Sequence, residues 1–155
     1  MSGSVHRYAT TCAWSGSTAA GYEGYDRSHT GSAPPAQTTV DLSSDPEFRG
    51  DAGRWNPEAL VVLAASSCQL LTFLAVAARA RVDVVDYRDD ADGEMPEAVR
   101  PMRITRIVLR PQITVRGDVA ESRLTHLVEV AHRECFIANS LSTDIVVEPK
   151  FLVAS

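Results

Sequence analysis

The stretch NPEALVVLAASSCQLLTFLAVAAR, residues 56–79, decides the fold, because it joins a helix start to a long uncharged run. Asn56 is a preferred N-cap residue, and Pro57 suits the first position of a helix. Glu58 then places a negative charge in the first turn, where the helix dipole is positive. We therefore expect a helix that begins after Asn56 and runs to about Arg79.

Residues 59–78 of this stretch carry no charge. A run of about twenty apolar residues is long enough to cross a bilayer. This run is rich in Ala and Ser, however, and holds the polar Gln69 near its centre. The rest of the chain alternates in the way that soluble β-structure does. We therefore expect a buried core helix and no membrane partner.

The chain before this helix shows short alternating segments and one long loop. Residues 6–14 follow a period-two pattern that indicates a strand, and residues 15–17 supply a turn. A second short strand is expected at residues 22–29. Residues 31–54 are rich in Pro, Ser, Gly and Asp, and only residues 38–42 look extended. A loop of that length in a compact domain is usually functional or mobile.

After the helix, the pattern predicts two strands, a second helix and a final strand. The two strands are expected at residues 82–87 and 102–115, with an acidic turn around residues 89–96. A second helix begins near Ala120, and its apolar residues recur at steps of three and four: Leu124, Leu127, Val128, Ala131 and Cys135. Residues 143–148 close the chain as a strand. This order of elements predicts an α+β fold.

The composition narrows the class of protein. With 155 residues the chain can bury one core without disulfides or metals, so we expect a single domain over residues 1–155. The net charge of -5, from 20 acidic and 15 basic residues, argues against nucleic acid as a partner. The first residues lack the basic start and apolar stretch of a secretory signal. Free thiols without metal-like spacing then favour a reducing cytoplasm.

Two cysteines, Cys68 and Cys135, lie on the inward faces of the two predicted helices. These two helices are expected to pack together, which would make the thiols neighbours. Two neighbouring thiols permit a redox cycle, in which a peroxide oxidises one thiolate to a sulfenic acid and the second thiol condenses with it to a disulfide. Cys12, on a predicted strand, is expected to be structural, because a free cysteine usually packs as a small hydrophobe.

This cycle needs a thiolate, and burial alone would raise the pKa of a cysteine in the middle of a helix. We therefore expect a cation that compensates. The segment YDRSH, residues 25–29, offers Arg27 as a cation that could fold over the helix. The alternative for Arg27 is a solvated surface arginine.

Three motifs carry a family resemblance: Asn56-Pro57-Glu58, Ser66-Ser67-Cys68 and AHRECFIANS at residues 131–140. Together they resemble the OsmC/Ohr family of peroxide-detoxifying proteins, over nearly the whole chain. The resemblance implies an α+β domain that forms an intertwined homodimer. Two long central helices would be flanked by antiparallel β-sheets, with active sites near the interface.

The resemblance also implies roles for four residues. Cys68 would attack the peroxide, and Cys135 would resolve the sulfenic acid. Arg27 would hold the thiolate, and Glu58 would pair with this arginine. No bound cofactor is implied, since the electrons pass through the cysteines. The implied reductant is a dithiol, such as a lipoyl group on a partner protein.

Helix geometry constrains the role of Glu58. At ~1.5 Å per residue, Glu58 and Cys68 stand ~15 Å apart on one helix, too far for one arginine to bridge comfortably. Unless Glu58 lies on a non-helical turn, we expect it to reach the site from the other subunit.

The chain departs from its OsmC-like subgroup at Gln69, where the subgroup often has His. This change could alter substrate preference or the delivery of a proton to the departing alcohol, for which His29 and His132 are candidate donors. We expect an organic hydroperoxide as substrate, because apolar helix residues could line an approach for an alkyl tail: Leu70, Leu71, Phe73 and Leu74. The same residues are also consistent with a plain core.

The same residues allow three other classes of function. A zinc site built from His132, Cys135 and Cys68 has acceptable ligand types but lacks a clear fourth ligand. A hydrolase with a cysteine nucleophile and His132 as base lacks an oxyanion loop. A non-enzymatic or slow stress or binding scaffold of the same fold is the main alternative, and peroxide-dependent turnover separates it from a peroxidase.

Overall fold

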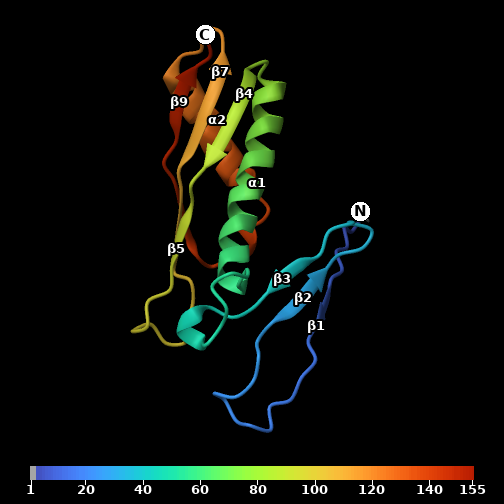
Figure 1. The fold of residues 1–155 in the computed structure, drawn as a ribbon. Coiled ribbons are helices and arrows are strands. Elements are labelled where there is room, and N and C mark those ends of the chain that lie inside the picture. The colour runs from blue at the N-terminus through green and yellow to red at the C-terminus, as the bar shows by residue number, and fades with distance from the viewer. Residues whose placement is uncertain (1–2) are drawn as a thin grey trace. The chain divides into compact units, whose positions relative to one another are not determined.

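The computed structural model describes residues 3–155, which form two compact units, one ending at Leu60 and the other spanning Val61–Ser155 (Figure 1). The first unit holds three short strands and the start of the long helix. The second holds the rest of that helix, the second helix and the remaining strands. The expectation of one domain over residues 1–155 stays a prediction.

The first unit is built on an antiparallel sheet in the order β1-β2-β3. Its elements are β1 (Thr11–Ala13), β2 (His29–Ser32), β3 (Val40–Leu42) and a short 3-10 helix, η1 (Pro46–Phe48). The antiparallel pairing of β1 with a following strand is as predicted, but residues 14–28 connect the two strands, not a turn at residues 15–17. The strand predicted at residues 22–29 is wrong, because β2 begins only at His29. The preceding residues instead turn around Arg27, whose guanidinium donates to the carbonyls of Tyr22 and Tyr25.

Helix α1 (Pro57–Arg79) begins where the sequence predicts. Asn56 caps it, since its Oδ1 accepts a hydrogen bond from the N–H of Ala59 at 2.8 Å. One face is buried and consists of Ala65, Gln69, Phe73, Val76 and Ala77. The other face exposes apolar side chains, namely Leu63, Leu71 and Leu74. The prediction of a core helix is thus confirmed for one face only.

Within residues 3–155, α1 is also the one helix that is long and apolar enough to cross a membrane by length and composition. Of the 18-residue window of α1 that this test uses, 22% is buried inside the chain. The core helix of a soluble protein passes the same test of length and composition. The outward face of α1 is therefore an apolar surface that the described part of the chain leaves uncovered.

The second unit contains two sheets of three strands. One has the order β4-β7-β9 and consists of β4 (Asp83–Asp89), β7 (Pro111–Arg116) and β9 (Lys150–Val153). The other has the order β5-β6-β8 and consists of β5 (Asp92–Glu94), β6 (Arg106–Leu109) and β8 (Asp144–Val147). The sequence did not predict β5, which lies in the acidic turn, or β9, which follows the predicted last strand.

The implied antiparallel sheets need a correction. Each sheet of the second unit contains one parallel pair, β6 with β8 and β7 with β9. Parallel neighbours require a crossover connection. The segment between β7 and β8 supplies it, since it contains helix α2 (Glu121–Glu134) and the short 3-10 helix η2 (Ala138–Ser140).

The strand predicted at residues 102–115 is in fact two strands, β6 and β7, that belong to different sheets and are separated by Arg110. The N–H of Arg110 donates to the carboxylate of Asp89 at 2.6 Å instead of to a neighbouring strand. Pro111 has no N–H to donate. The predicted inward alternation is correct, because the five residues of that face are buried: Ile107, Leu109, Pro111, Ile113 and Val115.

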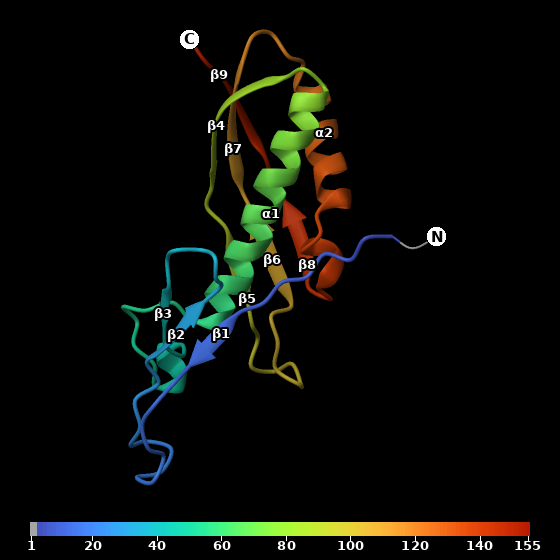
Figure 2. The same cartoon turned by 90° about the vertical axis from the view of Figure 1, so that its right-hand side faces the viewer.

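Helices α1 and α2 lie side by side against one face of the β4-β7-β9 sheet (Figure 1, Figure 2). Their shared core includes Phe73, Val76 and Ala77 from α1, Ile113 and Val115 from β7, and Leu124, Leu127, Val128 and Ala131 from α2. The predicted apolar stripe of α2 is therefore confirmed up to Ala131, and so is the α+β class. The helices have 23 and 14 residues.

Candidate active site

The second unit brings Cys68 and Cys135 within reach of a hydrogen bond between their side chains. Cys68 is partly buried in the middle of α1, whereas Cys135 is only 1% exposed. The prediction that Cys135 lies on the second helix is wrong, since α2 ends at Glu134 and the backbone is already extended at Cys135, with ψ of 115°. Leaving the helix turns the following N–H groups toward Cys68.

The two thiols differ in acidity. Burial alone would raise the pKa of Cys68, but its sulfur accepts hydrogen bonds from the N–H groups of Ile137 and Phe136 and from the thiol of Cys135. These bonds outweigh burial and hold the pKa of Cys68 below its usual value. Burial raises the pKa of Cys135, and its bond to Cys68 adds to the rise. Cys68 is therefore the thiol that ionises first.

Side-chain hydrogen bonds fix the turn that supplies these N–H groups. Asn139 Nδ2 donates to the carbonyls of Cys135 at 3.0 Å and Arg133 at 2.9 Å. Ser140 Oγ donates to the carbonyl of Phe136 at 2.7 Å. From the sequence alone, Asn139 and Ser140 are predicted only as residues that end the second helix. Their spacing, four residues after Cys135 and Phe136, is the signal that could have shown this second role.

Arg27, the predicted cation, lies in the first unit and is partly buried. Its guanidinium donates to the carbonyl of Tyr25 at 2.7 Å and to that of Tyr22, and it stacks 3.9 Å from the centre of the Tyr25 ring. Among residues 3–155 no carboxylate forms an ion pair with Arg27. The guanidinium thus keeps N–H donors available for an anion.

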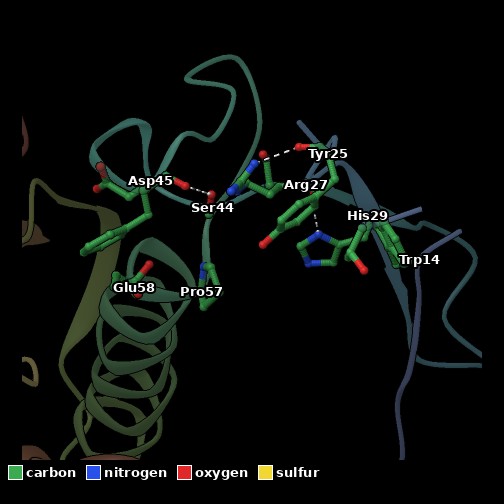
Figure 3. Close-up of a pocket in the computed structure, with 11 residues that line it drawn as sticks. Trp14, Tyr25, Arg27, His29, Ser44, Asp45, Pro57 and Glu58 are labelled. Carbon is green, nitrogen blue, oxygen red and sulfur yellow. Dashed lines mark hydrogen bonds between the residues drawn. The ribbon is translucent and has the colours of Figure 1, made fainter. Parts of the chain in front are cut away.

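Arg27 and Glu58 line one pocket of the first unit, with a volume of about 360 Å³ (Figure 3). Glu58 stands in the first turn of α1 and not on a non-helical turn. Aromatic side chains contribute to the same walls: Trp14, Tyr25 and Phe48. Figure 3 shows Glu58 at the helix start and Arg27 on the opposite side, beside His29. The pocket therefore combines aromatic walls with the cation of Arg27 and the carboxylates of Asp45 and Glu58.

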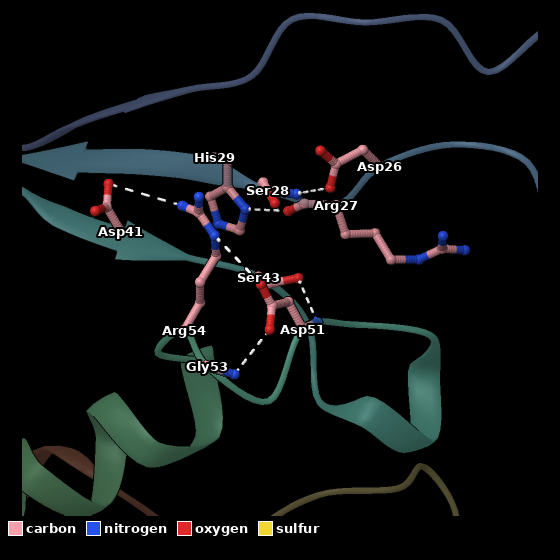
Figure 4. Close-up of polar contacts among 9 residues, drawn as sticks. All are labelled: Asp26, Arg27, Ser28, His29, Asp41, Ser43, Asp51, Gly53 and Arg54. Atoms are coloured by element: carbon pink, nitrogen blue, oxygen red, sulfur yellow. Dashed lines mark hydrogen bonds and ion pairs between the residues drawn. The ribbon is translucent and has the colours of Figure 1, made fainter.

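Short-range hydrogen bonds hold the turn that carries Arg27 (Figure 4). Asp26 Oδ1 accepts from the N–H of Ser28 at 2.8 Å, and this bond lowers the pKa of Asp26. His29 Nδ1 lies 2.7 Å from the carbonyl of Arg27. Because a carbonyl only accepts, Nδ1 carries the hydrogen and leaves Nε2 free for acid–base chemistry.

A second set of polar contacts, also shown in Figure 4, holds the loop before α1 in place. The buried hydroxyl of Ser43 accepts from the N–H of Asp51 at 3.0 Å. Asp51 Oδ1 accepts from the N–H of Gly53 at 2.8 Å. Arg54 lies 3.8 Å from the carboxylate of Asp41 and 3.7 Å from that of Asp51. The long loop predicted from composition is thus held by specific contacts.

Gln69, the departure from the subgroup, points into the interior and is 1% exposed. Its Nε2 donates to the carbonyl of Val128 on α2 at 3.4 Å. Of the apolar residues expected to line a substrate approach, Phe73 instead belongs to the core at 0% exposure. Leu71 and Leu74 lie on the outward face of α1.

The zinc alternative is not assembled in the structure. Within the described part of the chain, residues 3–155, no group of three His, Cys, Asp or Glu side chains is placed to hold a metal ion. His132 is in the last turn of α2, and its Nδ1 is buried without a partner among these residues. Cys12 is exposed on β1, so its predicted packing role is wrong.

Comparison with family models matches residues 50–150 to the family described as OsmC-like protein. Among solved structures, an OsmC-like protein of unknown function from Vibrio cholerae has a TM-score of 0.84 and 28% identity, and the match covers 94% of this chain and 99% of that one. The uncharacterised protein YmaD of Bacillus subtilis is 20% identical over 123 residues, which are 77% of this chain and 82% of YmaD.

More distant structures share the fold. An organic hydroperoxide resistance protein OsmC from Legionella pneumophila has a TM-score of 0.68 and 15% identity, over 96% of this chain and 98% of that one. The organic hydroperoxide resistance protein OhrB of Bacillus subtilis has a TM-score of 0.61 and 14% identity, over 95% and 98% of the two chains. At these identities the comparisons show a shared fold.

Proposed function

The chain belongs to the OsmC-like protein family, and from that premise we propose that it is a thiol-dependent peroxidase that reduces organic hydroperoxides. The observation that carries the proposal is the unequal pair of thiols, in which Cys68 ionises first while Cys135 keeps a proton beside it. The names of the similar proteins from Legionella pneumophila and Bacillus subtilis, organic hydroperoxide resistance proteins, agree with this substrate class.

In the first step, the Cys68 thiolate attacks the terminal oxygen of the hydroperoxide. The O–O bond breaks, and an S–O bond forms, so that Cys68 becomes a sulfenic acid. The remaining alkoxide takes up a proton and leaves as the alcohol. The hydrogen bonds from the turn after α2 support this step, because they favour the ionised form of the attacking sulfur.

In the second step, Cys135 attacks the sulfenic sulfur of Cys68. The S–O bond breaks, an S–S bond forms, and the hydroxyl leaves as water with the proton of Cys135. A dithiol then reduces the disulfide by exchange, and we propose a lipoyl group on a partner protein as one such donor. The cycle itself uses no bound cofactor, since both electrons pass through the thiols.

We assign Arg27 and Glu58 to the support of the Cys68 thiolate. Arg27 suits this role, because its guanidinium is held by carbonyls and aromatic rings and retains N–H donors for an anion. Glu58 lines the same pocket and would orient the guanidinium. Because Glu58 stands on the helix that carries Cys68, about 15 Å along it, we propose that Glu58 acts, together with the Arg27 of its own pocket, in the site of the partner subunit.

We further propose that the protein is a homodimer that covers the outward face of α1. The support is the exposed leucines of this helix, Leu63 at 46% and Leu71 at 64%. Leu71→Glu should then give a monomer in light scattering, because a charge cannot be buried unpaired at an interface. Val153→Glu, at a 69% exposed position on β9, is the matched control and should leave the dimer intact. A monomeric wild type would rule the dimer out.

The proposal places the protein in the cytoplasm, where dithiols return the disulfide to its reduced form. Its decisive test is consumption of cumene hydroperoxide by purified protein with dihydrolipoamide as reductant. Wild type should turn over, Cys68→Ser should not exceed the background rate, and Cys135→Ser should stop after one oxidation. If wild type is inert while both thiols are reduced, a non-enzymatic or slow scaffold takes the place of the peroxidase.

A further inference from the structure

One histidine of the first unit, His29, has no part yet in the proposed cycle. It lines the pocket of Arg27 and Glu58, and its ring lies beside Arg27 (Figure 3). It also lines a second pocket of the first unit, of about 450 Å³, together with Asp41 and Arg54. A partly buried imidazole that faces two pockets is a candidate for acid–base chemistry.

The backbone fixes which nitrogen of His29 can react. Nδ1 lies 2.7 Å from the carbonyl oxygen of Arg27, and since a carbonyl can only accept, Nδ1 is the donor of this bond. Asp26 holds the same turn, because its Oδ1 accepts from the N–H of Ser28 at 2.8 Å. Nε2 has no hydrogen-bond partner within residues 3–155. One nitrogen therefore anchors the ring, and the other is free to meet a ligand.

The charged groups around His29 are compatible with a ring that carries a proton on both nitrogens. The two pockets that His29 faces are lined by three carboxylates and two guanidinium groups: Asp41, Asp45, Glu58, Arg27 and Arg54. Because the carboxylates outnumber the guanidinium groups, the surroundings do not oppose a positive imidazolium. In this form Nε2 is a hydrogen-bond donor as well.

We propose that His29 is the general acid of the peroxide step, and that its protonated ring donates the Nε2 proton to the departing alkoxide. This role rests on the proposed function, in which the Arg27 pocket acts in the site of the partner subunit. The S–O bond forms as the O–O bond breaks, the proton passes from Nε2 to the alkoxide oxygen, and the alcohol leaves. Water then returns a proton to the ring.

The other candidate donor, His132, is less suited to this step. It lies in the last turn of α2, three residues before Cys135. Its Nδ1 is buried and has no partner among residues 3–155. A nitrogen enclosed in this way cannot readily regain a proton from water, whereas His29 faces two pockets.

The test compares two peroxides that both carry a phenyl ring but release different leaving groups. Cumene hydroperoxide releases a strongly basic alkoxide, which needs a proton, whereas perbenzoic acid releases benzoate, a weak base that does not. His29→Asn removes Nε2, while the amide nitrogen of Asn can replace Nδ1 in the bond to the Arg27 carbonyl. Oxidation of Cys68 is followed by rapid quench and mass spectrometry. The variant should react about 100-fold more slowly with cumene hydroperoxide, the lower end of the range for a positioned acid, and at an unchanged rate with perbenzoic acid.

His126→Asn, at an exposed position of α2, is the matched control and should leave both rates as in wild type. An equal loss with both peroxides in His29→Asn would overturn the proposal, because it indicates a structural role only. So would an unchanged rate with cumene hydroperoxide, or a loss confined to cumene hydroperoxide in His132→Asn instead. A wild type whose Cys68 stays reduced with both peroxides would refute the peroxidase itself, which is a different result from the failure of His29 alone.

Discussion

The thiol pair and the Arg27 pocket stabilise their charged groups by different means. One holds the thiolate of Cys68, and the other holds the guanidinium of Arg27. Around Cys68 the support comes from backbone N–H groups of a turn fixed next to a buried core. Around Arg27 it comes from carbonyls and tyrosine rings at the surface of a loop. A site built on core backbone is coupled to folding, whereas a site built on loop side chains can be altered without loss of the fold.

The largest expected effect is a loss of stability when the core beside the thiol pair is disrupted. Phe73→Ala should lower the free energy of unfolding by about 3–5 kcal/mol, because it removes a fully buried aromatic side chain. Trp14→Ala in the pocket, at 43% exposure, should cost about 1 kcal/mol or less. Urea denaturation measures both. Similar losses at the two positions would show that the pocket is as strongly coupled to the fold as the thiols are.

The second prediction separates chemistry from stability in the pocket. Arg27→Met should lower kcat/KM for an organic hydroperoxide about 10- to 100-fold, the range expected for one hydrogen bond to a charged group. The melting temperature should fall only slightly, because the two hydrogen bonds that Arg27 loses join residues of the same surface loop, and it has no ion pair among residues 3–155. Arg49→Met, which removes a cation 5.9 Å from the Tyr22 ring, is the control. Loss of activity in both variants alike would argue for a general charge effect.

The contrast also explains what could be predicted from the sequence. The start of α1 depends on Asn56 and its neighbours, and the packing of α2 depends on helical spacing, so both are local signals. The break at Arg110 depends on the distant carboxylate of Asp89. The parallel pairing of β9 likewise depends on a strand far away in sequence. Long-range contacts of this kind leave no local pattern.

The same division applies within the candidate site. Cys68 and Cys135 could be found because both fall on the apolar faces of predicted helices, although α2 itself ends one residue before Cys135. The N–H groups of Ile137 and Phe136 could not, because backbone donors have no residue type of their own.

A third, smaller effect concerns the helix that carries Cys68. Asn56→Ala removes the cap of α1 and should lower the free energy of unfolding by about 1 kcal/mol. The acidity of Cys68 should stay the same, because the groups that lower its pKa lie in the turn after α2. Thermal unfolding measures the loss of stability, and titration of the thiol measures the pKa of Cys68. A changed Cys68 titration would mean that the helix start also tunes the thiol.

The smallest effect tests that turn directly. Asn139→Ala frees the backbone around Cys135 and should move the pKa of Cys68 upward, because fewer N–H groups then favour the thiolate. The rate of alkylation by iodoacetamide rises with pH as the thiolate forms, so its midpoint should shift to higher pH in the variant. An unchanged midpoint would contradict the role of the turn.

The sign of the linked stability follows from the same pKa. The folded state lowers the pKa of Cys68, so the thiolate stabilises the fold fully above the pKa of the unfolded chain. This contribution disappears as the pH falls through the lower, folded value. In Asn139→Ala this contribution should be smaller, so the part of the stability difference from wild type that depends on pH should vanish at acidic pH, whereas the part due to the lost hydrogen bonds should remain.

The most direct test of the unequal thiol pair is the mass spectrum of the reduced protein after one equivalent of organic hydroperoxide, with peptide mapping of its three cysteines. The account predicts a disulfide between Cys68 and Cys135, with loss of two hydrogens and with Cys12 still a free thiol. Oxidation at Cys12 alone, or a sulfenic acid on Cys135 with Cys68 unreacted, would contradict it.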